Sequence, residues 1–411
     1  MQTIQTHRWK LNLWILWFTH LTGVMCFNFG VPFLPLYIQE IQPMSRETLT
    51  VYTSILSAGP AIAMGIMAPI WGYLSDRYGR KLMVLRASFS AAVLLSLMAY
   101  ATSVNQLIVL RTVQGFLTGT ITAAMTFVAA DAPEEDMSYA LGVISSATFI
   151  GFSIGPVIGS FFAIHYGYRL SFKAGGAIML LSFLLVLFLV KENKENFLIK
   201  RKEEKRIPIL QTYKNVILTP NVLIVLLMLF LLRVVRTIFI PYYPIFVSDF
   251  FQNSDTIVKY TGITDGFRSL STALACYFVG KFAVKFDRSK LLDWLIFVSL
   301  VISALFTTQA IHGSLFSLFR GIDAFAFLYV SYYLFIGGLE PIVTSVSTLS
   351  VEAENRGALF GLQGTVSSMA WFVSPVLGGS IAYHNGVSYV LLVIPIGLCM
   401  MLLAKKKMKF S

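Results

Sequence analysis

The segment GYLSDRYGRK, residues 72–81, lies between two long apolar stretches, residues 50–73 and 83–102. Four of its ten residues are charged, whereas the flanking stretches are almost free of charge. A helix needs about 20 apolar residues to cross a bilayer core of about 30 Å. The sequence therefore predicts two membrane-spanning helices joined by a short charged loop.

The composition of the whole chain is typical of a membrane protein. Of the 411 residues, 56% are hydrophobic and 13% are charged, whereas soluble domains have about 25% charged residues. The three cysteines (Cys26, Cys276 and Cys399) lie singly in apolar segments. This spacing indicates neither a disulfide framework nor a zinc site, so we expect no metal and no cofactor.

Twelve apolar stretches are predicted to cross the membrane in two sets of six. They are residues 12–38, 50–73, 83–102, 107–130, 139–163, 173–190, 221–247, 260–282, 292–311, 325–349, 358–382 and 387–404. We therefore expect an all-α integral membrane protein with an N-terminal bundle over residues 1–190 and a C-terminal bundle over residues 221–411. The charged interval 191–220 is predicted to be a cytoplasmic linker.

The net charge of +12 follows from the loops between these stretches. Most of the 32 Lys and Arg residues fall on one side of the membrane if the amino terminus is cytoplasmic. They form short runs and do not gather in the basic face typical of nucleic-acid binding. We expect both termini in the cytoplasm, a location in the cell's inner membrane, and no nucleic-acid partner.

An internal repeat relates the two halves. At a constant offset of 219, Phe116, Gly119, Glu135, Gly142, Pro156, Gly159, His165 and Gly167 match Phe335, Gly338, Glu354, Gly361, Pro375, Gly378, His384 and Gly386. Parallel six-helix repeats are typical of transporters whose substrate site lies between the halves near mid-membrane.

Residues 72–81 are similar to the G-x-L-x-D-R-x-G-R-K signature of the major facilitator superfamily. The resemblance implies the major facilitator fold, with twelve transmembrane helices in two pseudo-symmetric six-helix bundles. It also implies an inner gating latch, whose candidate residues are Gly72, Asp76, Arg77, Gly79 and Arg80. Gly72 would allow close helix approach, and Asp76 would accept hydrogen bonds. The alternative is a basic loop that only sets topology.

The segment GFSIGPVIGS, residues 151–160, resembles the G-x-x-x-G-P-x-x-G-G motif shared by drug–proton antiporters of this superfamily, with Ser160 in place of the last glycine. Its candidate motif residues are Gly151, Gly155, Pro156 and Gly159. Small residues allow close helix contact, and the proline bends the helix. Generic packing is the alternative. With Pro32 and Pro35 in a similar P-x-x-P ending, the resemblance points to the multidrug efflux branch.

A secondary transporter needs a titratable group within the membrane, and Glu340 in the stretch 325–349 is the candidate. Tyr333 lies on the same predicted helix stripe. Arg111 and Gln114 belong to a run similar to the superfamily's R-x-x-Q-G motif. The alternatives are a structural carboxylate neutralised by an arginine, and an arginine that clamps the first helix.

Arg233 and Arg236 lie one turn apart within the stretch 221–247. Two adjacent cations at mid-membrane require an anion, and the candidates are Glu340, Asp265 or the substrate. Such a pair disfavours lipophilic cations as substrates. It favours neutral, zwitterionic or anionic amphiphiles.

We therefore expect a monomeric secondary transporter that exports small amphiphilic compounds by proton antiport through alternating access. Its partners would be a small-molecule substrate, protons and membrane lipids. The alternative is an importer, a symporter or a lipid-headgroup flippase for an anionic substrate. The sequence contains no HExxH, no paired-aspartate protease motif, and no GxSxG or Ser/His site in a loop, so we expect no enzymatic activity.

Overall fold

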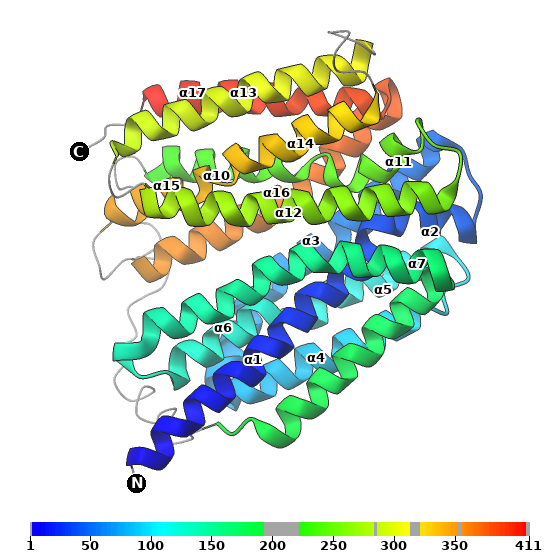
Figure 1. Ribbon diagram of the computed structural model, residues 1–411. Helices are drawn as coiled ribbons and strands as arrows, with labels where there is room; N and C mark the ends of the chain where they lie inside the picture. The colour runs from blue at the N-terminus through cyan, green and yellow to red at the C-terminus, as the bar shows by residue number, and fades with distance from the viewer. Residues whose placement is uncertain (1, 193–221, 283–285, 313–320, 352–355, 408–411) are drawn as a thin grey trace. The chain divides into compact units, whose positions relative to one another are not determined.

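The computed structural model describes residues 2–192, 222–282, 286–312, 321–351 and 356–407. These residues form helices joined by short connections and contain no strand (Figure 1). Of the predicted linker over residues 191–220, only Lys191 and Glu192 lie within the described part. The described chain thus has the all-α class that the sequence predicts.

The helices follow the apolar stretches in order. The first half contains α1 (Gln2–Gly30), η1 (Val31–Phe33), α2 (Leu34–Ile41), α3 (Arg46–Tyr78), α4 (Arg80–Met98), α5 (Val104–Leu117), α6 (Thr120–Asp131), η2 (Glu134–Asp136) and α7 (Met137–Leu189). The second half contains α10 (Val222–Thr237), η3 (Ile240–Tyr242), α11 (Tyr243–Val247), α12 (Ser254–Phe282), α13 (Arg288–His312), α14 (Ile322–Ile336), α15 (Leu339–Leu349), α16 (Arg356–Asn385), η5 (Val387–Leu392) and α17 (Val393–Lys406).

Nine segments of the described residues are long and apolar enough to cross a membrane. One of them, in α7, contains two predicted spans, which are separated by a non-helical residue at Gly167. The predicted span 107–130 is divided between α5 and α6, and α12 is less apolar because it carries charges such as Asp265 and Arg268. Each predicted span falls on helix, and the count of twelve stays a prediction.

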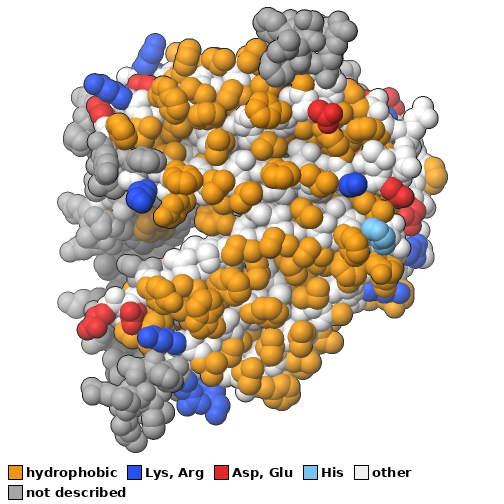
Figure 2. Space-filling view, viewed as in Figure 1, with side chains coloured by type: hydrophobic (Ala, Val, Ile, Leu, Met, Phe, Trp, Pro, Cys, Tyr) orange, Lys and Arg blue, Asp and Glu red, His pale blue; other side chains and the backbone are white. Residues whose placement is uncertain are grey.

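The helix surfaces are suited to a lipid environment. Figure 2 shows hydrophobic side chains over much of the length of the visible helices, whereas charged side chains gather mainly near the helix ends. Large apolar side chains such as Phe188 and Leu403 are exposed. A soluble protein rarely exposes so much apolar surface, whereas lipid tails contact it at no cost.

Residues related by the internal repeat interrupt the helices at equivalent positions in the two halves. Gly119 separates α5 from α6, and Gly338, 219 positions later, lies between α14 and α15. Gly167 has φ 78° and ψ 162°, and Gly386 has φ 101° and ψ 158°. Because an L side chain rarely adopts positive φ, glycine fixes the same bend before the last helix of each half.

A second repeat relates α1 and α2 to α10 and α11. Pro32 and Pro35 accompany η1 and the start of α2, and Pro241 and Pro244 accompany η3 and the start of α11. A proline has no N–H for the helix ladder, so each pair interrupts its helix with a short 3₁₀ turn. The spacing of these prolines is 209 residues, whereas the first repeat has an offset of 219.

The chain forms two compact units. The first comprises Met1–Pro43, Ile62–Lys205 and Val258–Gly266, and the second comprises Met44–Ala61, Arg206–Ile257 and Phe267–Ser411. The first part of α3 therefore groups with the second unit, and a segment of α12 groups with the first. The sequence predicts simpler boundaries at residues 190 and 220, and these boundaries stay a prediction.

In the first unit, α7 packs closely against α1. A Cβ atom at Gly155 would lie 2.8 Å from the carbonyl oxygen of Met25. One at Gly159 would lie 2.4 Å from the carbonyl oxygen of Phe29. Gly151, one turn before Gly155, lies similarly close to α1. The absence of a side chain at these positions lets two helix backbones approach to a distance that no other residue permits.

The neighbouring face of α7 packs against the segment of α12 that belongs to the same unit. A Cβ atom at Gly262 would lie 2.6 Å from Ser160 Cβ, and one at Gly266 would lie 2.9 Å from the carbonyl oxygen of Ser153. The segment 151–160 is therefore enclosed between α1 and α12. In the second unit, the repeat counterpart of Gly159, Gly378, lies against the Tyr242 side chain and the carbonyl oxygen of Ile238, just after the end of α10.

Gly159→Ala is expected to destabilise the protein by about 1–3 kcal/mol, because the added methyl group would meet backbone and not a movable side chain. Gly142→Ala is the matched control on the same helix, since no atom of the described part of the chain lies within 4 Å of its Cβ position. Thermal unfolding in detergent should show a lower midpoint for Gly159→Ala alone. Equal midpoints for the two variants would contradict the close packing of α7 on α1.

Candidate functional site

Glu340 lies just after a break in the helix that the sequence predicts over residues 325–349. The break is formed by Gly337 and Gly338, and Glu340 lies in the first turn of α15. A Cβ atom at Gly338 would lie 2.5 Å from Val279 Cγ2, so α12 approaches the break closely. The amino-terminal end of a helix favours a negative charge, and the break places Glu340 at such an end.

Glu340 forms ion pairs with both arginines of α10. Arg233 Nη2 donates to Oε1, and Arg236 Nη1 donates to Oε2. The side chains are partly exposed, at 25% for Glu340, 26% for Arg233 and 15% for Arg236. Two guanidinium groups and one carboxylate leave a net positive charge. We call these three residues the charge triad.

Tyr333 holds α14 against α10 beside the charge triad. Its hydroxyl donates to the carbonyl oxygen of Arg236 at 2.5 Å. The guanidinium of Arg268 lies over the Tyr333 ring, 5.0 Å from its centroid, which places a third cation near α14. Tyr333 is itself buried, and its role as a site residue stays a prediction.

Asp265, the other acidic candidate, is buried on α12. It belongs to the segment Val258–Gly266, which groups with the first unit, whereas the charge triad belongs to the second. Of the anions that the sequence suggests as partners of Arg233 and Arg236, Glu340 contacts both arginines.

Arg111 and Gln114 lie side by side on α5 in the first unit. Arg111 Nη1 donates to Gln114 Oε1 at 2.5 Å, and the guanidinium lies 4.9 Å from the centroid of the Phe27 ring on α1. Both polar side chains are buried. Arg111 Nε has no hydrogen-bond partner among the described residues. The contact with α1 thus involves an aromatic ring and not the backbone carbonyls that the clamp hypothesis suggests.

The predicted latch segment lies at the end of α3 and the start of α4. Gly79, with φ 103°, precedes the first residue of α4. The backbone N–H groups of Arg80 and Lys81 donate to the two carboxylate oxygens of Glu192, at 2.7 and 3.1 Å. Glu192 therefore caps α4. A Cβ atom at Gly79 would lie 2.8 Å from Glu192 Oε2, so the glycine makes room for the carboxylate.

The other candidate latch residues, Gly72, Asp76 and Arg77, lie in the last two turns of α3. No atom of the described residues lies within 4 Å of the Cβ position of Gly72, so a close helix approach at Gly72 stays a prediction. Arg77 is exposed and lies over the ring of Tyr78. Asp76 lies in α3, and its side chain is outside the described part of the structure.

Asn12 joins three segments close to this latch. Its Nδ2 donates to Asp131 Oδ2 at 2.7 Å and to the carbonyl oxygen of Lys191 at 3.0 Å. The Lys191 N–H donates back to Asn12 Oδ1 at 3.3 Å. Burial raises the pKa of the Asp131 carboxyl, and the hydrogen bond from Asn12 opposes this shift. The beginning of the linker is therefore attached to α1 and α6.

Comparison with known proteins identifies the family. Residues 16–337, more than half of the chain, match the family model of the Major Facilitator Superfamily. The chain belongs to this superfamily. It is therefore a membrane transporter protein and not an enzyme, as the sequence predicts.

Several relatives are named as multidrug exporters. The Multi-drug resistance efflux pump PmrA homolog of Lactococcus lactis is 28% identical over 394 residues, which cover 95% of this chain and 92% of that protein. Multidrug resistance protein MdtG of Klebsiella pneumoniae is 26% identical over 393 residues, covering 94% and 90%. MdtG of Proteus mirabilis is 38% identical over 190 residues, covering 46% and 47%. These relatives confirm the resemblance to multidrug exporters.

Solved structures confirm the major facilitator fold. The nucleoside transporter NupG, as its D323A mutant, superposes with a TM-score of 0.75 at 13% identity, covering 96% of this chain and 99% of that one. A bacterial homolog of the human lysosomal transporter Spinster, in an inward-facing and occupied conformation, gives 0.74 at 14% identity, covering 97% and 98%. At such low identity the likeness concerns the fold alone.

Glu192→Gln is expected to lower stability by about 1 kcal/mol, because a neutral amide forms weaker hydrogen bonds with the first N–H groups of α4. Thermal unfolding in detergent measures the change, with Glu40→Gln as the control. Glu40 is an exposed carboxylate near the end of α2. If the two variants unfold at the same temperature, the Glu192 cap contributes nothing.

Proposed function

We propose that this superfamily member exports small amphiphilic compounds across the cell's inner membrane in exchange for protons, through alternating access. The observation that carries the proposal is the charge triad, a carboxylate held by two arginines on membrane-spanning helices. The names of the relatives support drug export, and the antiporter-like segment 151–160 supports exchange. Both termini would lie in the cytoplasm.

Proton binding to Glu340 requires a change in the charge triad. Two guanidinium groups in contact favour the ionised carboxylate, and a protonated Glu340 would leave both cations without a counter-charge. The carboxyl must therefore move away from α10 to carry a proton. Because α15 begins at a glycine break, Glu340 lies at the end of a short helix segment that can move relative to α14.

Exchange requires that substrate and proton exclude each other. A substrate that stabilises the charge triad with both ion pairs formed favours the ionised carboxylate, and so makes Glu340 release its proton. A neutral or zwitterionic compound can do this if its donor group faces the Glu340 carboxylate and its acceptor groups face the arginines. The partial exposure of all three side chains leaves them accessible to such a compound.

A second candidate is uptake of an anionic substrate together with a proton. The net positive charge of the charge triad favours uptake of an anion. An anion that binds Arg233 and Arg236 in place of Glu340 leaves a carboxyl that prefers to be protonated. Anion and proton would then bind together, as in a symporter. The sign of the proton change on substrate binding distinguishes the two candidates.

Glu340→Gln is expected to abolish transport driven by a pH gradient in proteoliposomes, while downhill exchange of a zwitterionic fluorescent drug persists. The amide keeps the shape of the side chain but cannot carry a proton. Asp323→Asn, which removes a carboxylate from the first turn of α14, is the control and should transport normally. Transport at the normal rate by Glu340→Gln under the same gradient would refute the proposed role.

Loss of stability must be separated from loss of coupling. Glu340→Gln leaves the partly buried cations Arg233 and Arg236 without a carboxylate partner, which is expected to lower the thermal midpoint. The double variant Glu340→Gln with Arg233→Gln removes one of these cations and should recover part of the thermal midpoint. It should still show no pH-driven transport. If the double variant recovers both the thermal midpoint and pH-driven transport, Glu340 has a structural role only.

A further inference from the structure

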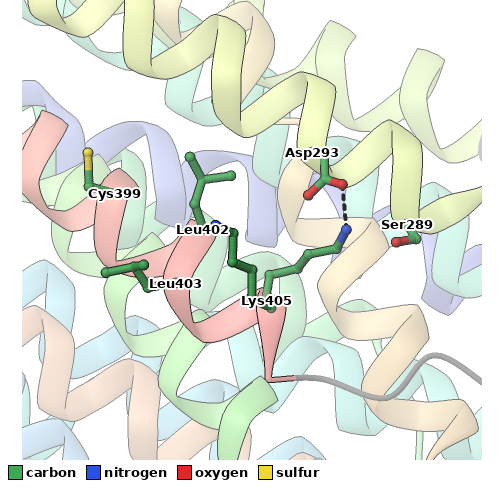
Figure 3. Close-up of a pocket in the computed structure, with 7 residues that line it drawn as sticks. Ser289, Asp293, Cys399, Leu402, Leu403 and Lys405 are labelled. Carbon is green, nitrogen blue, oxygen red and sulfur yellow. Dashed lines mark hydrogen bonds and ion pairs between the residues drawn. The ribbon is translucent and has the colours of Figure 1, made fainter.

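A pocket of about 710 Å³ lies between the beginning of α13 and the end of α17, within the second unit (Figure 3). Its polar lining comes from Ser289 and Asp293 on α13 and from Lys405 and Lys406 on α17. Leu402 and Leu403 line its apolar part. The pocket is thus polar at the helix ends and apolar along the helices.

The pocket carries more positive than negative charge. Lys405 Nζ donates to Asp293 Oδ2 at 2.5 Å, which neutralises both groups (Figure 3). Lys406 lines the pocket and is exposed, and Lys407 follows it. On α13, Lys290 is exposed beside Ser289.

The other carboxylate at these helix ends belongs to Asp287. Asp287 Oδ1 accepts from the backbone N–H of Ser289 at 2.8 Å and so caps α13. Arg288 adds a further positive charge at the same helix end. The pocket and the residues beside it thus carry two carboxylates, Asp287 and Asp293, and a larger number of cations. These cations are Arg288, Lys290, Lys405, Lys406 and Lys407, of which Lys405 and Lys406 line the pocket.

Large apolar side chains continue from the pocket along both helices. Leu403 and Ile396 on α17, and Trp294 and Phe297 on α13, are each more than half exposed. Tryptophan is enriched where the hydrocarbon core of a bilayer meets its headgroups. Trp294 lies nearly two turns into α13, which is consistent with cations at headgroup depth and apolar side chains at acyl-chain depth.

We propose that this pocket binds one anionic phospholipid, such as phosphatidylglycerol, from the cytoplasmic leaflet. Its phosphate would contact Lys406 and Lys290, and its acyl chains would lie along Leu403 and Phe297. Basic pockets between membrane helices on the cytoplasmic side suit anionic headgroups. The Asp293–Lys405 ion pair removes a carboxylate that would repel the phosphate.

The test adds lipid to the full-length protein in detergent and follows thermal unfolding. Phosphatidylglycerol should raise the midpoint, whereas phosphatidylcholine with the same acyl chains and soluble glycerol 3-phosphate should not. Lys290→Gln with Lys406→Gln should weaken the apparent affinity for phosphatidylglycerol about tenfold or more. Neither lysine takes part in the Asp293 pair, so this variant should fold normally.

The control is Lys173→Gln with Lys259→Gln, which makes the same charge change outside the pocket and should respond as the unmodified protein. Cys399 gives a second measurement, because it is exposed and lines the pocket. Its maleimide labelling, followed by peptide mass spectrometry, should be slower in nanodiscs of phosphatidylglycerol than in phosphatidylcholine. Unchanged lipid response in the pocket variant, or an equal response to glycerol 3-phosphate, would overturn the lipid assignment.

Discussion

A charge inside a membrane must be paired, hydrated or stacked on an aromatic ring, and this constraint arranges the functional residues of the chain. In the second unit, Arg233 and Arg236 share the carboxylate of Glu340. In the first unit, Arg111 contacts Gln114 and the ring of Phe27. These charges thus have different surroundings in the two units, and the charge triad joins a titratable carboxylate to excess positive charge. For this reason we assign coupling to the second unit.

Apolar length and repeated residues make most of the fold predictable from the sequence. Each apolar stretch falls on helix, and Gly167 and Gly386 repeat one backbone bend in both halves. The break before Glu340 is harder to predict, because glycine also occurs within unbroken membrane helices and the two glycines there have ordinary φ. The break depends on α12 packing against Gly338, which is a tertiary contact.

The candidate site is predictable in its members but not in its contacts. Glu340 and the two arginines stand out because charge is costly in an apolar stretch. Their pairing depends on how α15 is rotated relative to α10, which hydropathy does not determine. Glu192 could not be distinguished from the other charges of the linker, since its capping role depends on where the end of α7 lies relative to α4.

The central claim is that substrate closes the charge triad and expels a proton from Glu340. Proton exchange measured on adding substrate to the detergent-solubilised protein in a weakly buffered solution tests this directly. The account predicts proton release that disappears in Glu340→Gln and persists in Asp323→Asn. Proton uptake would contradict antiport and favour the symport of an anion, whereas equal release from the unmodified protein and Glu340→Gln would remove Glu340 from the mechanism and direct attention to Asp265.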